Sequence, residues 1–118
     1  MSHGSRLAAA AAAALGMVTL SRPAAAETDP KTVKVWKAKC ASCHGADGKG
    51  GTETGAKLGI PDMTAAAWQK KVTDAQMKTS ILDGLVRPGK TEGMEPYRDK
   101  LQPEQVDALV AYVRSLAK

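Results

Sequence analysis

The stretch WKAKCASCHGADGKG, residues 36–50, decides the fold because it holds both cysteines of the chain and one of its two histidines. Cys40 and Cys43 are separated by two residues, and His44 follows directly. Three chemistries use such a group: a redox-active disulfide, a zinc site, or two thioether bonds to a haem whose iron the histidine ligates. The surrounding sequence distinguishes between them.

The disulfide and zinc interpretations fit the rest of the chain poorly. A redox-active C-x-x-C pair sits beside alternating strands and helices, and no strand pattern is present here. A structural zinc needs about four ligands, and residues 27–118 offer only Cys40, Cys43 and His44 as soft ligands. The C-x-x-C-H spacing is itself that of c-type haem attachment. Cysteines about one helical turn apart reach one porphyrin edge, and His44 then lies under the iron.

The residues before the motif predict a helix that ends in it. Asp29 is a good N-cap and Pro30 suits the first helical position. Val33, Trp36 and the cysteines then recur at helical spacing on one face. The motif therefore closes the first helix, and the glycine-rich residues 45–62 read as a loop.

Three further helices are expected after this loop. Thr64 can cap a short helix that runs through Trp68. Thr73 and Gln76 form a capping box for the next helix, which Gly84 ends. Residues 85–100 read as loop.

The last helix begins at Pro103, after a poor cap at Gln102. Its apolar stripe consists of Val106, Leu109, Val110, Val113 and Leu116. The sequence thus predicts an all-α fold of about four helices.

A small core makes a central cofactor useful. The chain has no Phe, and its only aromatic residues are Trp36, Trp68, Tyr97 and Tyr112. A domain this small buries little surface and usually needs a disulfide, a metal or another covalent support. A large apolar group in its centre would meet that need.

Residues 1–26 read as an export signal, with a cationic start, an apolar run from Leu7 to Leu20 and small residues before Glu27. A membrane-spanning helix needs about 20 apolar residues, so cleavage after Ala26 is favoured over a retained anchor. The expected mature domain is residues 27–118, and its location is the periplasm. Its 15 basic and 12 acidic residues give a net charge of +3, too weak to argue for nucleic acid.

A haem iron bound by His44 needs a sixth ligand, and residues 27–118 contain no second histidine. Met77 lies on a helical face and suits core packing. Met63 follows Pro61 closely, so it is expected on the same side of the motif as the loop that holds Pro61. Met94 lies in a loop bounded by Gly and Pro, so it can approach from the opposite face. His/Met pairing is typical of electron-transfer cytochromes, and Met94 is the predicted ligand. The Pro61 carbonyl is the predicted acceptor for the His44 Nδ1–H.

The chain resembles the class I, monohaem c-type cytochromes over essentially the whole of residues 27–118. The resemblance lies in WKAKCASCHGADGKG, LGIPDMTAAAWQ and GMEPYRDKLQPEQVDALVAYVRSL. The middle segment is also similar to that of the c-type subunits of haem-copper oxidases. The resemblance implies a cytochrome c-like fold around one covalent haem c, whose first and last helices cross near Trp36, Leu109 and Tyr112. At the crossing the family usually has a glycine where this chain has Thr32.

Two more aromatic residues have expected roles beside the haem. Trp68 either donates its indole N–H to a haem propionate, as in some relatives, or covers the haem edge. Tyr97 is expected to pack on the haem beside Met94.

The expected function is one-electron transfer between membrane or periplasmic redox proteins, with no chemical product and hence no enzymatic activity. A haem enzyme or gas sensor is the alternative if the sixth position is vacant, and a fixed subunit of a larger dehydrogenase or oxidase is a third possibility. Six lysines around the attachment helix suit either a solvated face or a docking patch for an acidic partner. They are Lys31, Lys34, Lys37, Lys39, Lys49 and Lys57.

Overall fold

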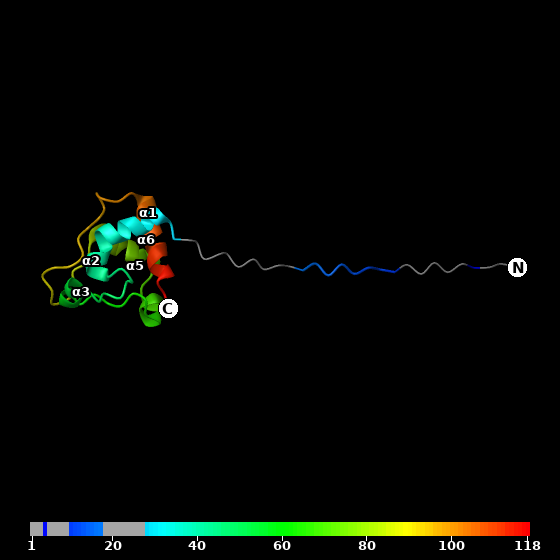
Figure 1. Ribbon diagram of the computed structural model, residues 1–118, viewed down its shortest axis with the longest axis horizontal. Helices are drawn as coiled ribbons and strands as arrows, with labels where there is room; N and C mark the ends of the chain where they lie inside the picture. The colour runs from blue at the N-terminus through cyan, green and yellow to red at the C-terminus, as the bar shows by residue number, and fades with distance from the viewer. Residues whose placement is uncertain (1–3, 5–9, 18–27) are drawn as a thin grey trace.

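The computed structural model of the chain describes residues 4, 10–17 and 28–118. Within these residues the structure is helical, and the only β-structure is one antiparallel bridge between Leu85 and Met94. The predicted all-α fold is confirmed. Figure 1 shows the helices gathered into one body, with α6 beside α1 and α5. The helical segments are α1 (Pro30–Val35), η1 (Trp36–Cys40), α2 (Ala41–His44), α3 (Glu53–Leu58), α4 (Ala66–Lys71), α5 (Asp74–Asp83) and α6 (Pro103–Ser115).

The predicted signal segment falls largely outside the described residues, and so does its cleavage position after Ala26. Residues 10–17 carry no helix or strand. Among the described residues, no helix combines the length and the apolar character that crossing a membrane requires.

The first helix is a continuous run of α1, η1 and α2 that ends in the cysteine motif, as predicted. The Asp29 side chain caps it by accepting a hydrogen bond from the Lys31 N–H at 3.1 Å. Its middle part is a π-helical turn, in which the Ala41 N–H donates to the Trp36 carbonyl five residues earlier. Such wide turns recur at functional sites, and this one lies immediately before the motif.

One of the predicted helix starts differs from the structure. The Thr64 hydroxyl donates to Asp62 at 2.6 Å instead of capping, so α4 begins at Ala66 and continues past Trp68 to Lys71. Helix α6 begins at Pro103 as predicted. Its start is supported by Gln105, whose side chain accepts a hydrogen bond from the Gln102 N–H at 2.8 Å.

The cap of α5 agrees with the prediction, and one helix is additional to it. The capping box of Thr73 and Gln76 at the start of α5 is confirmed. Helix α3 lies inside the predicted loop of residues 45–62. Thr52 caps it by accepting from the Gly55 N–H at 2.8 Å.

The crossing of the first and last helices is as the resemblance implied. Trp36 and Leu109 are 3% and 2% exposed, and Tyr112 meets the Trp36 ring edge-on with centroids 5.1 Å apart. Thr32 is buried at 6% exposure where α1 contacts α6. A threonine is therefore accommodated at this position.

Arg114 joins α6 to the end of α4, the start of α5 and the turn between them. Its guanidinium donates to the carbonyls of Gln69 and Val72, each at 2.6 Å, and forms an ion pair with Asp74 at 2.8 Å. The Gln69 side chain in turn donates to the Met63 carbonyl at 2.7 Å. These bonds fix residues 63–74 against the last helix.

Gly55 allows α3 to lie against the backbone of the motif. A Cβ built at Gly55 would lie 2.6 Å from the Cys43 carbonyl oxygen and closer still to that of Gly50. Both obstacles are backbone atoms, so a side chain here must displace α3 or the motif.

Gly55→Ala should therefore destabilise the haem-loaded protein by about 1–3 kcal/mol, the usual cost of forcing extra atoms into a packed site. Gly51→Ala is the matched control, because a Cβ at Gly51 meets no atom within 4 Å. Urea unfolding followed by circular dichroism measures both. Equal stability of the two variants would contradict the packing described.

Candidate functional site

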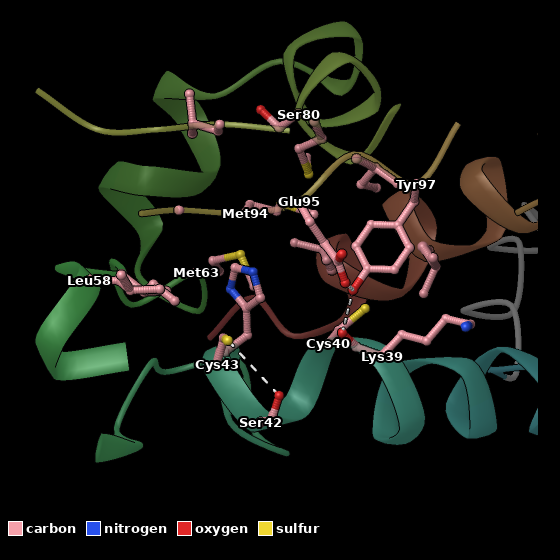
Figure 2. Close-up of a pocket in the computed structure, with 18 of the residues that line it drawn as sticks. Lys39, Cys40, Ser42, Cys43, Leu58, Met63, Ser80, Met94, Glu95 and Tyr97 are labelled. Carbon is pink, nitrogen blue, oxygen red and sulfur yellow. Dashed lines mark hydrogen bonds between the residues drawn. The ribbon is translucent and has the colours of Figure 1, made fainter. Parts of the chain in front are cut away.

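The cysteine motif borders a cavity of about 620 Å³ in the centre of the helical body. Figure 2 shows Cys40 and Cys43 on the helix below this cavity, with the Met94 segment crossing the view above them. All the predicted site residues line it: Cys40, Cys43, His44, Pro61, Trp68, Met94 and Tyr97. Residues from four separate parts of the sequence thus converge on one space.

The two cysteines are free thiols, both partly buried at the cavity wall. Burial raises the pKa of Cys40 to about 11, against a smaller opposite effect of Lys39. Cys40 is therefore a neutral thiol at physiological pH. Both sulfurs face the same cavity as His44, which is the arrangement that attachment to one ligand requires.

His44 is held as a neutral imidazole beside Trp36. Burial lowers the His44 pKa below its ordinary value, which favours the uncharged form that serves as a metal ligand. The Trp36 ring lies with its centroid 5.7 Å from that of His44, and its indole N–H donates to the Gly45 carbonyl at 3.2 Å. Trp36 thus fixes both the ring and the turn that follows it.

The predicted hydrogen bond from His44 to Pro61 is absent from the described structure. Nδ1 of His44 is buried without a hydrogen-bond partner. The Pro61 carbonyl oxygen lies near Gly50, at 3.3 Å from a Cβ built there. Pro61 itself still lines the cavity.

Hydrogen bonds from the following loop to the backbone carbonyls of the motif hold its C-terminal end in place. The Thr52 hydroxyl donates to the Cys43 carbonyl at 2.9 Å, and the Gly50 N–H donates to the His44 carbonyl at 2.7 Å. Gly45 leaves the helix with φ of +82°, a conformation that favours glycine. These contacts hold the motif in one position relative to the cavity.

The cavity is lined by three methionines, which differ in how their backbones are held. Met63 and Met77 are each 6% exposed, and Met94 is partly buried. The Met94 backbone pairs with Leu85 through bonds of 3.0 and 2.8 Å. Gly93 makes this pairing possible, because a Cβ there would overlap the Leu85 carbonyl oxygen.

Tyr97 and Trp68 close other parts of the wall. Tyr97 is 7% exposed, and its hydroxyl donates to the Lys39 carbonyl at 3.0 Å. Burial, followed by the nearby Glu95 carboxylate, raises the pKa of Tyr97 to about 12. Trp68 reaches the cavity from α4.

Much of the cavity wall consists of apolar residues that were not predicted as part of the site. These residues are Leu58, Ile60, Val72, Ile81, Leu85, Leu109 and Val113. Leu58 and Ile60 flank Gly59 in a glycine-rich stretch. Isolated apolar residues in such a stretch were the signal from which this part of the cavity wall could have been predicted. The cavity therefore has an apolar wall and a small number of liganding groups, which is typical of a cofactor site.

The residues present fit a covalently bound haem. The cavity volume lies within the ~300–1,000 Å³ usual for sites of large organic ligands. Two thiols, the His44 imidazole and the thioether side chains of three methionines line it. The buried Nδ1 of His44 has no hydrogen-bond partner. Within residues 4, 10–17 and 28–118 no group of three His, Cys, Asp or Glu side chains is placed to hold a metal ion.

Comparison with known proteins identifies the class. Residues 31–117 match the family model described as cytochrome c, and the chain belongs to this family. Its cofactor is therefore haem c, with its iron, attached covalently, and its chemistry is haem-based electron transfer.

Individual relatives agree with this. The chain is 33% identical over 88 residues to the cbb3-type cytochrome c oxidase subunit FixP of Sinorhizobium medicae, and 35% identical over 81 residues to subunit CcoP of Rubrivivax gelatinosus. The matches cover 71% and 69% of this chain but only 28% and 24% of those relatives. The chain is 37% identical to the c-type cytochrome KustC0563, whose solved structure matches it with a TM-score of 0.65. This match covers 74% of the present chain and 98% of KustC0563.

Replacing both attachment residues, Cys40→Ala with Cys43→Ala, should yield a chain that carries no covalent haem and unfolds with little cooperativity. The physical reason is that the cavity lies where a small domain would otherwise place its core. Intact mass and scanning calorimetry, against wild type from the same export-competent host, measure this. A sharp calorimetric transition in the haem-free double variant would contradict it.

Proposed function

We propose that the chain is a periplasmic one-electron carrier whose haem iron is ligated by His44 and Met94. The observation that carries the proposal is that a neutral imidazole and a methionine from a distant loop face one cavity. When bound, haem c supplies an iron that alternates between Fe(II) and Fe(III). Cys40 and Cys43 would attach the group, and His44 and Met94 would bind its iron.

Met94 is better suited than Met63 to the sixth position. The Met63 N–H donates to the carbonyl of Gly48, four residues after His44, so Met63 is tied to the loop that follows the motif. Met94 instead pairs with Leu85 beyond the end of α5. A donor on a separate segment can approach the iron from the face that His44 leaves free.

Met77 has a packing role of its own. It lies within α5, with its backbone N–H bonded to the Thr73 carbonyl at 3.0 Å, and it is 6% exposed in the core cluster. A helical backbone does not adjust to bring a side chain onto the iron as a loop does. Met94 thus remains the best donor of the three.

With His44 and Met94 both bound, the iron would have no open position for a substrate, which favours a carrier over an enzyme or a gas sensor. Methionine ligation also raises the reduction potential. Pro61, Trp68 and Tyr97 complete the haem pocket in this proposal. Trp68 either donates to a propionate or covers the haem edge.

The proposed partners are membrane or periplasmic redox proteins, such as a reductase, an oxidase or a dehydrogenase. The similarity to oxidase subunits supports this class of partner, and it equally favours a second candidate, a fixed subunit of a larger complex. Co-purification distinguishes a free carrier from a fixed subunit. The six lysines around the attachment helix are exposed and offer a basic surface to an acidic partner.

Met94→Ala should remove the weak near-infrared absorption band that a methionine–iron bond gives oxidised cytochromes. It should also lower the reduction potential and open the iron to carbon monoxide. Met63→Ala and Met77→Ala are the matched controls, because both methionines line the same cavity, and they should keep the band.

The opposite pattern, with the band surviving in Met94→Ala and vanishing in Met63→Ala, would move the ligand to Met63. A wild-type protein that never shows the band and binds carbon monoxide readily would favour an enzyme or a sensor.

Export should remove residues 1–26, since their pattern is that of a cleaved signal. N-terminal sequencing of periplasmic protein should therefore begin at or near Glu27. A sequence that starts well before Ala24, or protein that stays with the membrane fraction, would support a retained anchor instead.

A further inference from the structure

The Tyr97 hydroxyl joins two segments that are far apart in the sequence. It donates to the carbonyl of Lys39, 58 residues earlier, at 3.0 Å. Lys39 is the residue before Cys40 and lies in η1, the π-helical turn. Tyr97 lies three residues after Met94. One hydrogen bond therefore connects the helix that carries the haem attachment to the segment that carries the proposed ligand, as the dashed line in Figure 2 shows.

The other bonds of this segment lead elsewhere. Met94 pairs with Leu85, and the Tyr97 and Arg98 N–H groups donate to the carbonyls of Ile81 and Leu82 at 2.9 and 3.2 Å. All of these fix residues 94–98 to α5 and its continuation. Among the hydrogen bonds of the described residues, only that from Tyr97 to Lys39 joins this segment to residues 30–44.

The position of Tyr97 makes this bond persistent. The residue is 7% exposed, and the bond is part-buried, so competing water is restricted. A hydrogen bond is stronger where water is restricted in this way.

Glu95 is the alternative acceptor for the same proton. Its Oε1 lies 3.2 Å from the Tyr97 hydroxyl, and its Oε2 pairs with Lys100 at 2.9 Å. Glu95 is exposed and belongs to the same segment as Tyr97. A bond to Glu95 therefore stabilises the segment internally and does not connect it to the attachment helix.

We propose that Tyr97 is a positioning residue whose bond to the Lys39 carbonyl keeps the Met94 segment at a fixed distance from the attachment helix, so that the methionine stays on the iron. This inference rests on the proposed ligation by Met94. Without the bond, the segment would separate more often from the helix, and the sixth position would open more often to outside ligands.

The rate of cyanide binding to the oxidised, haem-loaded protein measures this opening, because cyanide enters only when the methionine has left. Tyr97→Phe keeps the ring in the core and removes only the hydroxyl. It should raise the rate about fivefold, the effect of one ordinary net hydrogen bond. Glu95→Gln should change the rate by less than about twofold, since an exposed ion pair contributes little.

Two controls separate positioning from general stability. Tyr112→Phe removes a hydroxyl that bonds no described residue and lies outside the cavity lining. Thr73→Ala weakens the fold through loss of the α5 cap without touching the cavity. Both should bind cyanide at close to the wild-type rate, and urea unfolding reports the stability of each variant.

The proposal is overturned if Tyr97→Phe binds cyanide at the wild-type rate, if Thr73→Ala accelerates binding as much as Tyr97→Phe, or if Glu95→Gln has the larger effect. Met94→Ala serves as the fully open reference. A wild type as fast as Met94→Ala would overturn ligation by Met94 itself. A slow wild type, a fast Met94→Ala and an unchanged Tyr97→Phe would overturn the positioning role alone.

Discussion

The structure depends on one geometric constraint: residues 40–44 must present two sulfurs and an imidazole to the same cavity. The helical spacing of Cys40 and Cys43 places both thiols on one wall, and the left-handed turn at Gly45 ends the helix directly after His44. Hydrogen bonds from Thr52 and Gly50 then hold the last two carbonyls of the motif. The loop and α3 therefore act as a support for the attachment site.

The rest of the fold encloses the space that this motif faces. Leu109 and Val113 of α6 form part of the cavity wall and also belong to the buried core, so the cavity and the core are continuous. Arg114 ties the same helix to the end of α4, the start of α5 and the turn between them. For a family member that carries covalent haem c, this means that the cofactor completes the core of a domain with few aromatic residues.

Much of this could be predicted from the sequence, because the relevant signals are local. The cap at Asp29, the box at Thr73 and the apolar stripe of α6 all depend on neighbouring residues. Helix α3 was missed because Gly55 within it and Gly59 at its C-cap read as loop signals. Gly55 in fact serves close packing against the backbone, which is a tertiary property.

The other missed features also depend on distant parts of the chain. The Tyr97 bond crosses 58 residues, and the Pro61 carbonyl oxygen lies near the backbone of Gly50 and not on His44 Nδ1. The most direct test of the whole account is the NMR spectrum of the reduced, haem-loaded protein with labelled methionine methyl groups. The account predicts that the methyl of Met94 alone is shifted far upfield by the haem ring current, as an axial ligand must be. A shift of that size at Met63, or at no methionine, would contradict it.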